Sequence, residues 1–282
     1  MSIVIVTDST CDLPSHVIQE LNITVVPLYI NIGDKGYLDG VEITRKDFYT
    51  NLAGYTVHPT TGTPGVDAFK AAYQTLAEKG HTEILSIHIS EKLSATVNVA
   101  RNAAQEFTQI PVTVRDAGQL SLGTGFQVER AARMAMDGKS MQEIETALDD
   151  LKARTLVAAR LDTLEFLRRS GRMNRFIAGI GSVLQLKPIL TMQNGQPGSE
   201  RVRTTHKAEA RLLKMLEELQ PIEQFSLLHT NSAEQAQALR QQAAHLLPEQ
   251  ATYSMDITPV IGAHLGPGAV GYAVISKNPV KK

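Results

Sequence analysis

A chain of 282 residues, 43% of them hydrophobic, can bury a large core, and its length favours two domains over one. Its formal net charge is −1, because 28 Lys and Arg residues nearly balance 29 Asp and Glu residues, and neither sign forms a long run. These values argue against a nucleic acid or an acidic membrane surface as the main partner. The single cysteine, Cys11, excludes an internal disulfide and fits a reducing compartment, so we expect a cytoplasmic protein.

The N-terminal part of the chain begins with a short apolar strand. Residues 3–7 form a β-branched run, and Asp8 ends it too early for a signal peptide or a membrane span. A helix is expected to start at residues 12–14, with Pro14 in its first turn. Residues 23–32 predict a second strand. Because such runs alternate with amphipathic helical patterns along the whole chain, the sequence predicts an α/β fold in which helices cover the sheets.

Two helices separated by a loop are predicted next. Thr44 and Asp47 resemble a capping box that opens a short helix ending near Gly54. Residues 55–65 are expected to form a polar loop. The second helix is predicted from its apolar spacing and its end signals. These are Pro64 in the first turn, the stripe Val66, Phe69, Tyr73 and Leu76, and Gly80 at the stop.

The rest of the first half contains two predicted strands and three predicted helices. Residues 84–89 predict a buried strand, residues 90–96 a polar turn, and residues 112–114 a further strand. A helix between the strands is indicated by Val97, Ala100, Ala104 and Phe107. Two helices follow, one at about residues 119–136 and one opened by a Ser140 and Glu143 capping box, with the stripe Met141, Ile144, Leu148 and Leu151. The first domain is therefore expected to span residues 1–155.

Residues 156–282 are expected to form a second α/β domain. Its first strand is predicted at residues 156–161, and Asp162 with Glu165 is expected to cap a short basic helix that ends at residues 170–172. The Asn194-Gly195 dipeptide favours a hairpin turn. The hairpin leads from a strand at 188–192 to residues 201–203, two helix and strand units follow, and the last strand lies at 271–275.

The usual signatures of nucleotide, metal and catalytic sites are absent from the sequence. Residues 266–271 match G-x-G-x-x-G, but a strand follows them instead of the helix that a dinucleotide fold requires. Gly123 and Gly125 lie in a predicted helix, where glycine most often marks close packing. The chain has no phosphate-binding loop, no nucleophile elbow and no paired cysteines. We therefore expect neither a cofactor nor a metal.

Two hydroxyl-rich turns and one histidine are the candidate binding residues. Residues 60–64 and 93–96 each precede a predicted helix, where free amides can receive an anion. Taken singly, each turn is better explained as N-capping. Two such turns in consecutive β-loop-α units are more informative, because loops at the same end of a sheet can converge on one ligand. His264 is expected in a loop at 261–268, where it either holds a ligand or caps the turn.

Six segments together resemble the DegV family along nearly the whole chain. They are Val6–Thr10, Thr61–Pro64, Leu93–Thr96, Asp116 with Gln119–Ser121, Ser170–Arg172 and His264–Gly268. The resemblance implies a two-domain α/β fold with a fatty acid buried between or alongside the domains. It also implies similarity to the acyl-binding component of bacterial fatty acid kinase.

The same resemblance implies roles for individual residues. Thr61, Ser94 and His264 would hold the acyl carboxyl group, and Arg172 would contact a docked partner. Supporting pocket positions are implied at Gly62, Thr63 and Thr96. The chain departs from the family pattern at Gly62-Thr63, where Ser-Gln is common, at Ala95, where Gly is common, and at Ala117, where Ser or Thr is usual. These departures keep the three head-group positions and change the finer shape of the pocket.

We therefore expect a lipid-binding protein without its own nucleotide site and without stable membrane insertion. It would enclose a long-chain fatty acid, such as palmitate, and present the carboxyl group to an ATP-dependent fatty acid kinase. The main alternative is a serine-type acyl hydrolase that uses Ser94, His264 and an acid such as Asp116. A third class, a DNA-binding regulator, lacks support because the sequence has no basic stripe or helix-turn-helix signature.

Overall fold

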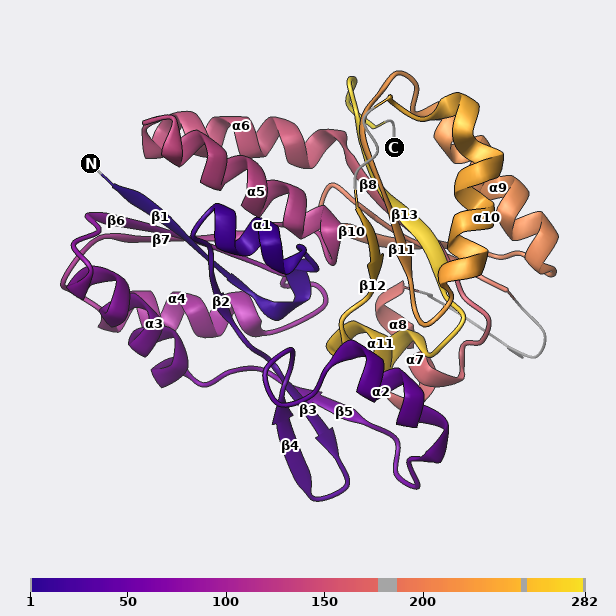
Figure 1. The fold of residues 1–282 in the computed structure, drawn as a ribbon, viewed down its shortest axis with the longest axis horizontal. Helices are drawn as coiled ribbons and strands as arrows, with labels where there is room; N and C mark the ends of the chain where they lie inside the picture. Colours follow the sequence, from indigo (N-terminus) through magenta and orange to yellow (C-terminus); the bar gives the residue numbers. More distant parts are fainter. Residues whose placement is uncertain (1, 177–186, 250–252, 281–282) are drawn as a thin grey trace.

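The structure is a computed structural model that describes residues 2–176, 187–249 and 253–280. Over these residues the chain forms two large sheets that lie side by side and a small third sheet beneath them (Figure 1). Helices cover the faces of both large sheets. The predicted α/β class is therefore confirmed.

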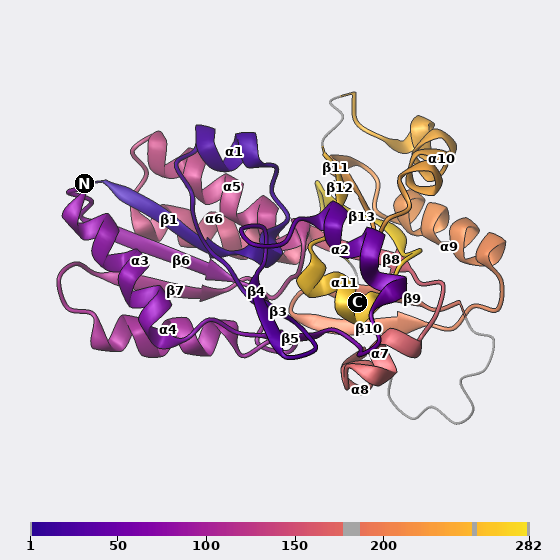
Figure 2. The same ribbon diagram turned by 60° about the horizontal axis from the view of Figure 1, so that its bottom comes forward.

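The first large sheet is parallel and lies between two layers of helices. Its strands, in spatial order, are β2 Thr24–Val26, β1 Ile3–Asp8, β6 Glu83–His88 and β7 Val112–Asp116. The helices α3 Val66–Glu78 and α4 Thr96–Glu106 cover one face, and α1 Ser15–Glu20 and α5 Leu122–Met136 cover the other, with α6 Met141–Arg154 beside α5 (Figure 2). Since both faces of the sheet are buried, its strands are apolar at successive positions, and this explains the continuous β-branched runs of the sequence.

The small sheet is antiparallel and corrects two predictions. Its strands, in spatial order, are β4 Lys35–Leu38, β3 Tyr29–Ile32 and β5 Thr60–Gly62. The single strand predicted at 23–32 is broken around Pro27 into β2 and β3, which belong to different sheets, because proline has no amide hydrogen to continue a ladder. The predicted polar loop at 55–65 contains β5. The helix α2 Arg45–Asn51 begins as predicted, with Thr44 accepting a hydrogen bond from the Asp47 amide, and a 3-10 turn at Leu52–Gly54 follows.

The second large sheet is mostly antiparallel. Its strands, in spatial order, are β10 Gln196–Glu200, β9 Ile189–Gln193, β8 Thr155–Arg160, β13 Val270–Ser276, β11 Ile222–His229 and β12 Ser254–Asp256. The helices α9 Thr205–Glu218 and α10 Ala233–Ala243 pack on its outer face (Figure 1). The predicted turn at Asn194-Gly195 is confirmed, since both residues have positive φ. The second strand of this hairpin, β10, ends at Glu200, before the predicted residues 201–203. The two helix and strand units predicted after it are confirmed.

Short helices lie beside the small sheet and the second large sheet, namely α7 Glu165–Arg169, α8 Met173–Phe176 and α11 Pro259–Leu265 (Figure 1). A 3-10 turn, η1 Ser9–Cys11, follows β1 of the first large sheet. The loop predicted at 261–268 is wrong for its first five residues, which belong to α11. The predicted cap of α7 by Asp162 is also wrong. Thr163 Oγ1 accepts from the Glu165 amide at 3.1 Å, whereas the Asp162 carboxylate accepts from Arg160.

Predictions of helix starts held where a side-chain cap sets them and failed where they relied on proline. The Ser140 and Glu143 capping box at the start of α6 is confirmed. Pro14 is the N-cap residue of α1, outside its first turn. Pro64 lies one residue before Gly65, the N-cap of α3. A proline near a helix start therefore fixed these boundaries only to within a residue or two.

One hydrophobic core joins the two large sheets. Ile5 and Leu85 of the first sheet belong to the same buried cluster as Val157 and Ala273 of the second, and residues of α5 and α6 fill the space between them. The outer faces have their own clusters, under α3 and α4 and under α9 and α10. The second sheet begins at Thr155, next to the predicted boundary. The division into domains at 1–155 and 156–282 stays a prediction, because the two parts share this core.

Candidate functional site

The parallel sheet reverses its direction of winding between β1 and β6. From β1 the chain moves to β2 on one side, whereas from β6 it moves to β7 on the other. In open α/β sheets such a point leaves a crevice at the carboxyl ends of the strands, where ligands bind. The segments that leave β1 and β6 contribute Thr10, Ile89, Leu93 and Ser94 to the wall of a cavity of about 400 Å³.

This cavity brings together the three residues with predicted head-group roles. Thr61 comes from β5, Ser94 from the turn after β6 and His264 from α11, and all three line the cavity. Thr61 Oγ1 lies 3.0 Å from His264 Nε2. Ser94 Oγ lies 2.8 Å from the hydroxyl of Thr96, which is fully buried. Residues more than 160 positions apart in the sequence thus meet at one polar wall.

The N-capping explanation of the two hydroxyl turns fits only one of them, and only in part. Thr61 lies in a strand, and the N-cap of α3 is Gly65, so no side chain caps this helix. The neighbouring Gly62 and Thr63 line the cavity with Thr61. Ser94 accepts a 3.3 Å hydrogen bond from the Thr96 amide at the start of α4 and also lines the cavity. Thr61 therefore faces the cavity without serving as a cap.

His264 is a neutral imidazole in this environment. Its pKa falls from 6.5 to about 3, first because the ring is buried and then because Arg172, His58 and Arg175 lie nearby. Its Nδ1 atom is buried and has no hydrogen-bond partner among the described residues. A neutral imidazole can donate from one nitrogen and accept at the other. The Nε2 atom can therefore either donate to the Thr61 hydroxyl or accept from it.

We expect His264 to make the folded protein sensitive to acid. Its folded pKa of about 3 lies below the unfolded value of 6.5, so between these values the unfolded chain binds more protons. The stability contributed by this group is therefore fully present above pH 6.5 and is lost as the pH falls towards 3. Urea unfolding at intervals across this range measures the effect, and His264→Gln should make the fall shallower.

His264→Gln is needed as a reference because Asp12, another buried group, changes the stability with pH in the opposite direction. Burial raises the pKa of Asp12 to about 6, although Arg45 Nη2 lies 2.9 Å from its carboxylate. The stability contributed by Asp12 is thus lost as the pH rises through about 6. Subtracting the His264→Gln curve from the parent curve removes the Asp12 contribution. Parallel curves for the two proteins would contradict the prediction for His264.

Many of the other residues that line the cavity are apolar. Among them are Leu28, Ile89, Leu93, Leu167 and Val260. Four further residues, which we call the neck, also line a second, narrower space of about 30 Å³: Leu120, Phe176, Ile261 and Leu265. This deep compartment is bounded mainly by Val157, Leu161, Leu190, Met192, Leu228 and Ile257. Because the two spaces share the four neck residues, they lie next to each other.

The hydrolase alternative requires Ser94, His264 and Asp116 to be joined by hydrogen bonds. The structure describes no such bonds among these residues. Ser94 contacts Thr96, His264 contacts Thr61, and Asp116 accepts from the Gly118 amide at 2.8 Å. The geometry of an activated serine is therefore not present at this wall of the cavity.

A different Ser-His-Asp chain lies inside the first sheet. Ser86 Oγ is 2.7 Å from His88 Nε2, and His88 Nδ1 is 3.0 Å from Asp8 Oδ2. All three side chains are fully buried, and none lines the cavity. Asp8 also accepts hydrogen bonds from the amides of Thr10 and Ile89, two residues of the cavity wall. This buried chain fixes the turns that leave β1 and β6 and has no access to a substrate.

Comparisons with known proteins agree with this architecture. The sequence model of a family described as "Uncharacterised protein, DegV family" matches residues 2–277. The chain belongs to the DegV family. A DegV domain-containing protein of Streptomyces coelicolor is 35% identical over 280 residues, which cover 98% of this chain and 99% of the relative. The resemblance predicted from the six sequence segments is confirmed.

Solved DegV structures share the fold over almost their whole length. A fatty-acid-binding DegV family protein from Thermus thermophilus has a TM-score of 0.89 and 36% identity, and the match covers 98% of this chain and 100% of that one. DegV of Bacillus subtilis, described as a fatty acid binding protein, has a TM-score of 0.89, 30% identity and the same coverage. The two solved structures therefore share with this chain the arrangement of both large sheets.

Two arginines of this DegV chain lie on the cavity wall. Arg172 lines it with Nη1 donating to the Ser170 carbonyl at 2.6 Å, and its buried Nε has no partner among the described residues. Arg175 of α8 also lines the cavity and donates to the Lys92 carbonyl at 3.0 Å. Sequence reasoning missed Arg175, although its position three residues after Arg172 in a basic segment was a usable signal. The docking role of Arg172 stays a prediction.

Other features that the sequence raised for this DegV protein can be placed in the structure. The Cys11 thiol is buried, and burial raises its pKa to about 12. Within residues 2–176, 187–249 and 253–280, no three His, Cys, Asp or Glu side chains are grouped so that they could hold a metal ion. In the same ranges no helix has the length and hydropathy to cross a bilayer.

Proposed function

We propose that this DegV protein binds one long-chain fatty acid. Its carboxyl group would lie against Thr61, Ser94 and His264, and its acyl chain would pass the neck into the deep compartment. The observation that carries the proposal is a cavity that combines hydroxyl and imidazole groups with many apolar side chains, next to a second, mainly apolar space with which it shares the four neck residues. The fatty acid binding attributed to the Thermus and Bacillus relatives supports it.

The two ends of the path would contribute differently to binding. Each methylene removed from water contributes ~0.8 kcal/mol, so the acyl chain supplies most of the affinity. The carboxyl group is the costly part, because burying it without partners costs several kcal/mol. Two hydroxyl donors and a neutral imidazole can satisfy it. The polar end therefore decides which head group is accepted, and the apolar path decides which chain.

The direct test is to identify what the purified protein carries. The protein is extracted with organic solvent after gel filtration, and the released lipid is identified by mass spectrometry. We expect free fatty acids of the palmitate class at up to one per chain. An extract that contains no fatty acid, together with failure of the lipid-free protein to bind palmitate in a fluorescence displacement assay, would refute the proposal.

We further propose that the protein is a cytoplasmic carrier that presents the carboxyl group to an ATP-dependent fatty acid kinase. Its sequence has no nucleotide-binding signature, and phosphoryl transfer needs positioned phosphates, usually with a divalent ion. The activating step would thus belong to a partner. Arg172 is half-buried at the cavity wall, next to the head-group residues, so a partner that contacts it would reach the carboxyl group.

Arg172→Ala is expected to impair transfer more than binding. A docking arginine typically contributes 2 kcal/mol or more, which corresponds to at least about a thirtyfold loss of acyl phosphate formation. A half-exposed contact with the ligand contributes at most about 1 kcal/mol, or about fivefold in affinity. Acyl phosphate formed with kinase and ATP is measured beside palmitate affinity. Arg169→Ala is the control, since this exposed arginine pairs with Glu165 outside the cavity wall.

Equal losses of transfer and affinity in Arg172→Ala would assign this residue to the pocket alone. Acyl phosphate made by the purified chain with ATP and no partner would reject the carrier role itself.

The hydrolase alternative predicts a different result with activated esters. Because Ser94 has no hydrogen bond to His264, we expect no turnover of p-nitrophenyl palmitate above the rate with bovine serum albumin at equal concentration. Hydrolysis that disappears in Ser94→Ala would favour the hydrolase.

A further inference from the structure

The helix that carries His264 ends in a turn that is fixed by residues outside the cavity. The turn comprises Gly266, Pro267 and Gly268, and both glycines have positive φ, at 74° and 89°. A Cβ atom at Gly266 would collide with the Phe166 ring, and one at Gly268 would collide with the Asp162 carboxylate. The G-x-G-x-x-G match of the sequence is thus explained by close backbone packing, because a side chain at either position has no room.

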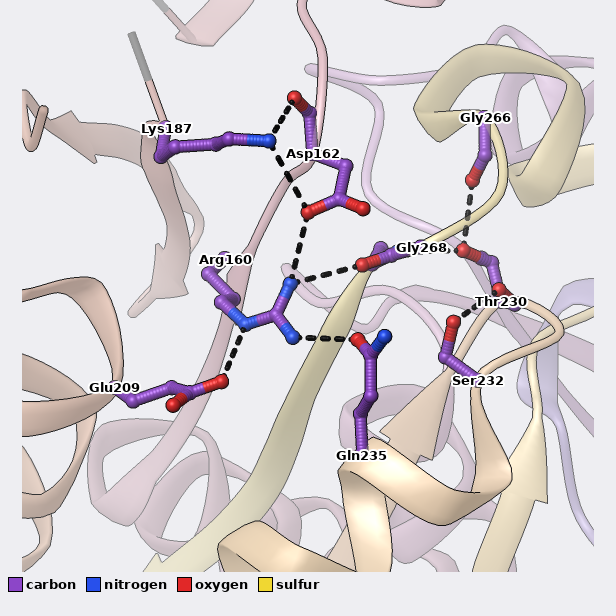
Figure 3. Close-up of polar contacts among 10 residues, drawn as sticks. Arg160, Asp162, Lys187, Glu209, Thr230, Ser232, Gln235, Gly266 and Gly268 are labelled. Atoms are coloured by element: carbon purple, nitrogen blue, oxygen red, sulfur yellow. Dashed lines mark hydrogen bonds and ion pairs between the residues drawn. The ribbon is translucent and has the colours of Figure 1, made fainter. Parts of the chain in front are cut away.

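Thr230 makes four hydrogen bonds to this turn and the residue after it. Its hydroxyl donates to the Gly266 carbonyl at 2.7 Å and accepts from the Ala269 amide at 2.8 Å (Figure 3). Its backbone amide donates to the Ala269 carbonyl, and its carbonyl accepts from the Gly268 amide. Thr230 is fully buried and does not line the fatty acid cavity.

Arg160 holds the other side of the same turn. Its Nη1 donates to the Gly268 carbonyl at 3.0 Å and to Asp162 Oδ1 at 3.1 Å (Figure 3). The rest of the guanidinium is bonded to Glu209 and Gln235. Only 1% of Arg160 is exposed, so the group is held by its partners and not by water. Buried hydrogen bonds from Thr230 and from Arg160 therefore fix the turn on two sides.

The turn also determines where α11 ends. The Gly266 amide donates to the Gly262 carbonyl at 2.8 Å and closes the last turn of the helix, two residues after His264. His264 Nε2 lies 3.0 Å from Thr61 Oγ1 on the cavity wall, and a contact of this length tolerates little movement of the ring. A shift of Gly266 would be passed to His264 through this short helix.

We propose that Thr230 is a positioning residue that sets His264 for recognition of the ligand's carboxyl group. The proposal rests on the proposed function, in which His264 contacts that group. It assigns a role in ligand choice to a residue that touches neither the ligand nor the cavity. Thr230→Val keeps the shape of the side chain but removes both hydroxyl hydrogen bonds, which frees the Gly266 carbonyl and the Ala269 amide.

The test compares the affinities for palmitate and for hexadecanol, which share the chain and differ in the head group. Loss of head-group positioning lowers the palmitate-to-hexadecanol affinity ratio, whereas general damage lowers both affinities together. We expect Thr230→Val to lower the ratio by about threefold to tenfold. Thr230→Ser keeps the hydroxyl and should restore the ratio. NMR of the imidazole should show the His264 ring signals shifted in Thr230→Val and close to the parent in Thr230→Ser.

A matched control separates positioning from stability. Thr155 is also fully buried in the second sheet, and its hydroxyl donates to the Leu151 carbonyl at 2.7 Å, at the opposite end of β8 from Arg160. Thr155→Val should lower the melting temperature but leave the ratio and the His264 signals unchanged. An unchanged ratio in folded Thr230→Val would overturn the proposal. If Thr230→Val does not fold, Arg160→Lys replaces it, because it removes the donor to the Gly268 carbonyl and retains the cation.

His264→Ala distinguishes the two levels of the proposal. If it leaves the ratio unchanged, the head-group role of His264 fails, and the positioning role of Thr230 fails with it. If it lowers the ratio and Thr230→Val does not, only the positioning role is rejected.

Discussion

Replacing Leu120 by tryptophan is expected to weaken the binding of long acyl chains and to spare short ones. Leu120 is a neck residue that lines both the main cavity and the deep compartment. It is half-buried at the edge of the shared core, so a larger ring is expected to project into the space between the two. If the ring shuts off roughly two methylenes, which is about what a space of about 30 Å³ can hold, the loss of ~0.8 kcal/mol for each corresponds to about a 15-fold weaker affinity for palmitate. Octanoate should lose little.

The measurement is a series of affinities against chain length. The parent should bind more tightly with each added methylene, whereas Leu120→Trp should reach a plateau once the chain meets the neck. Leu247→Trp is the control, because Leu247 is half-buried against the hydrophobic cluster under α9 and α10 and does not line the cavity. An equal loss at every chain length would show that the ring disturbs the head-group end or the fold, and unchanged palmitate affinity would remove Leu120 from the path.

Thr61→Val and Ser94→Ala are expected to give effects of similar size. In the proposed complex, each change removes one hydroxyl donor to the buried carboxyl group. A hydrogen bond to a charged group contributes about 1.5–3 kcal/mol, so palmitate affinity should fall by about tenfold or more in each variant. Hexadecanol affinity should change much less, because its head group carries no charge. Isothermal titration with both ligands measures the two effects.

Thr124→Val provides the control for the loss of a buried hydroxyl. The Thr124 hydroxyl is buried in α5, has no hydrogen-bond partner among the described residues, and does not line the cavity. Its removal should leave both affinities unchanged and should not destabilise the fold. Unchanged palmitate affinity in both Thr61→Val and Ser94→Ala would remove these residues from the head-group site.

The elements that the sequence predicted well are those whose signals are local. The continuous apolar run of β1, the stripe of α3 and the Ser140 capping box of α6 depend on near neighbours, and all three are confirmed. The positions of Thr61, Ser94 and His264 came from short motifs, and the structure gathers them at one cavity. Their roles in binding stay predictions.

The elements that were missed depend on partners far along the chain. β5 is a polar segment that becomes a strand only because it pairs with β3, about thirty residues earlier. Gly262, Gly266 and Pro267 suggested a loop around His264. However, Gly262 belongs to a helix, in which a Cβ atom would collide with the Tyr49 hydroxyl. The carboxylate of Asp12 holds the Thr258 amide at 2.9 Å, at the start of α11. Tertiary contacts therefore override the local signal in both places.

The deep compartment and the neck also had no sequence signature. Their apolar residues come from β8, β9, β11, α8, α11 and the loops that follow β8 and precede α5 and α11. Each looks like an ordinary core residue in its own segment. Only the packing of these segments leaves an unfilled path between them. A cavity is a property of the assembled fold, and a list of apolar positions cannot reveal where packing stops short.

The cavity wall is built from both halves of the chain, and the halves also share one core. An unfolded chain cannot offer this wall, so a ligand that occupies it is linked to folding by mass action. At a free ligand concentration one hundred times its Kd, the free energy of unfolding rises by about 2.7 kcal/mol. This is a large share of the 5–15 kcal/mol that typically keeps a domain folded. The empty form would then be the one that proteases remove first, and, under the proposed function, the cellular amount of this protein would follow the supply of fatty acid.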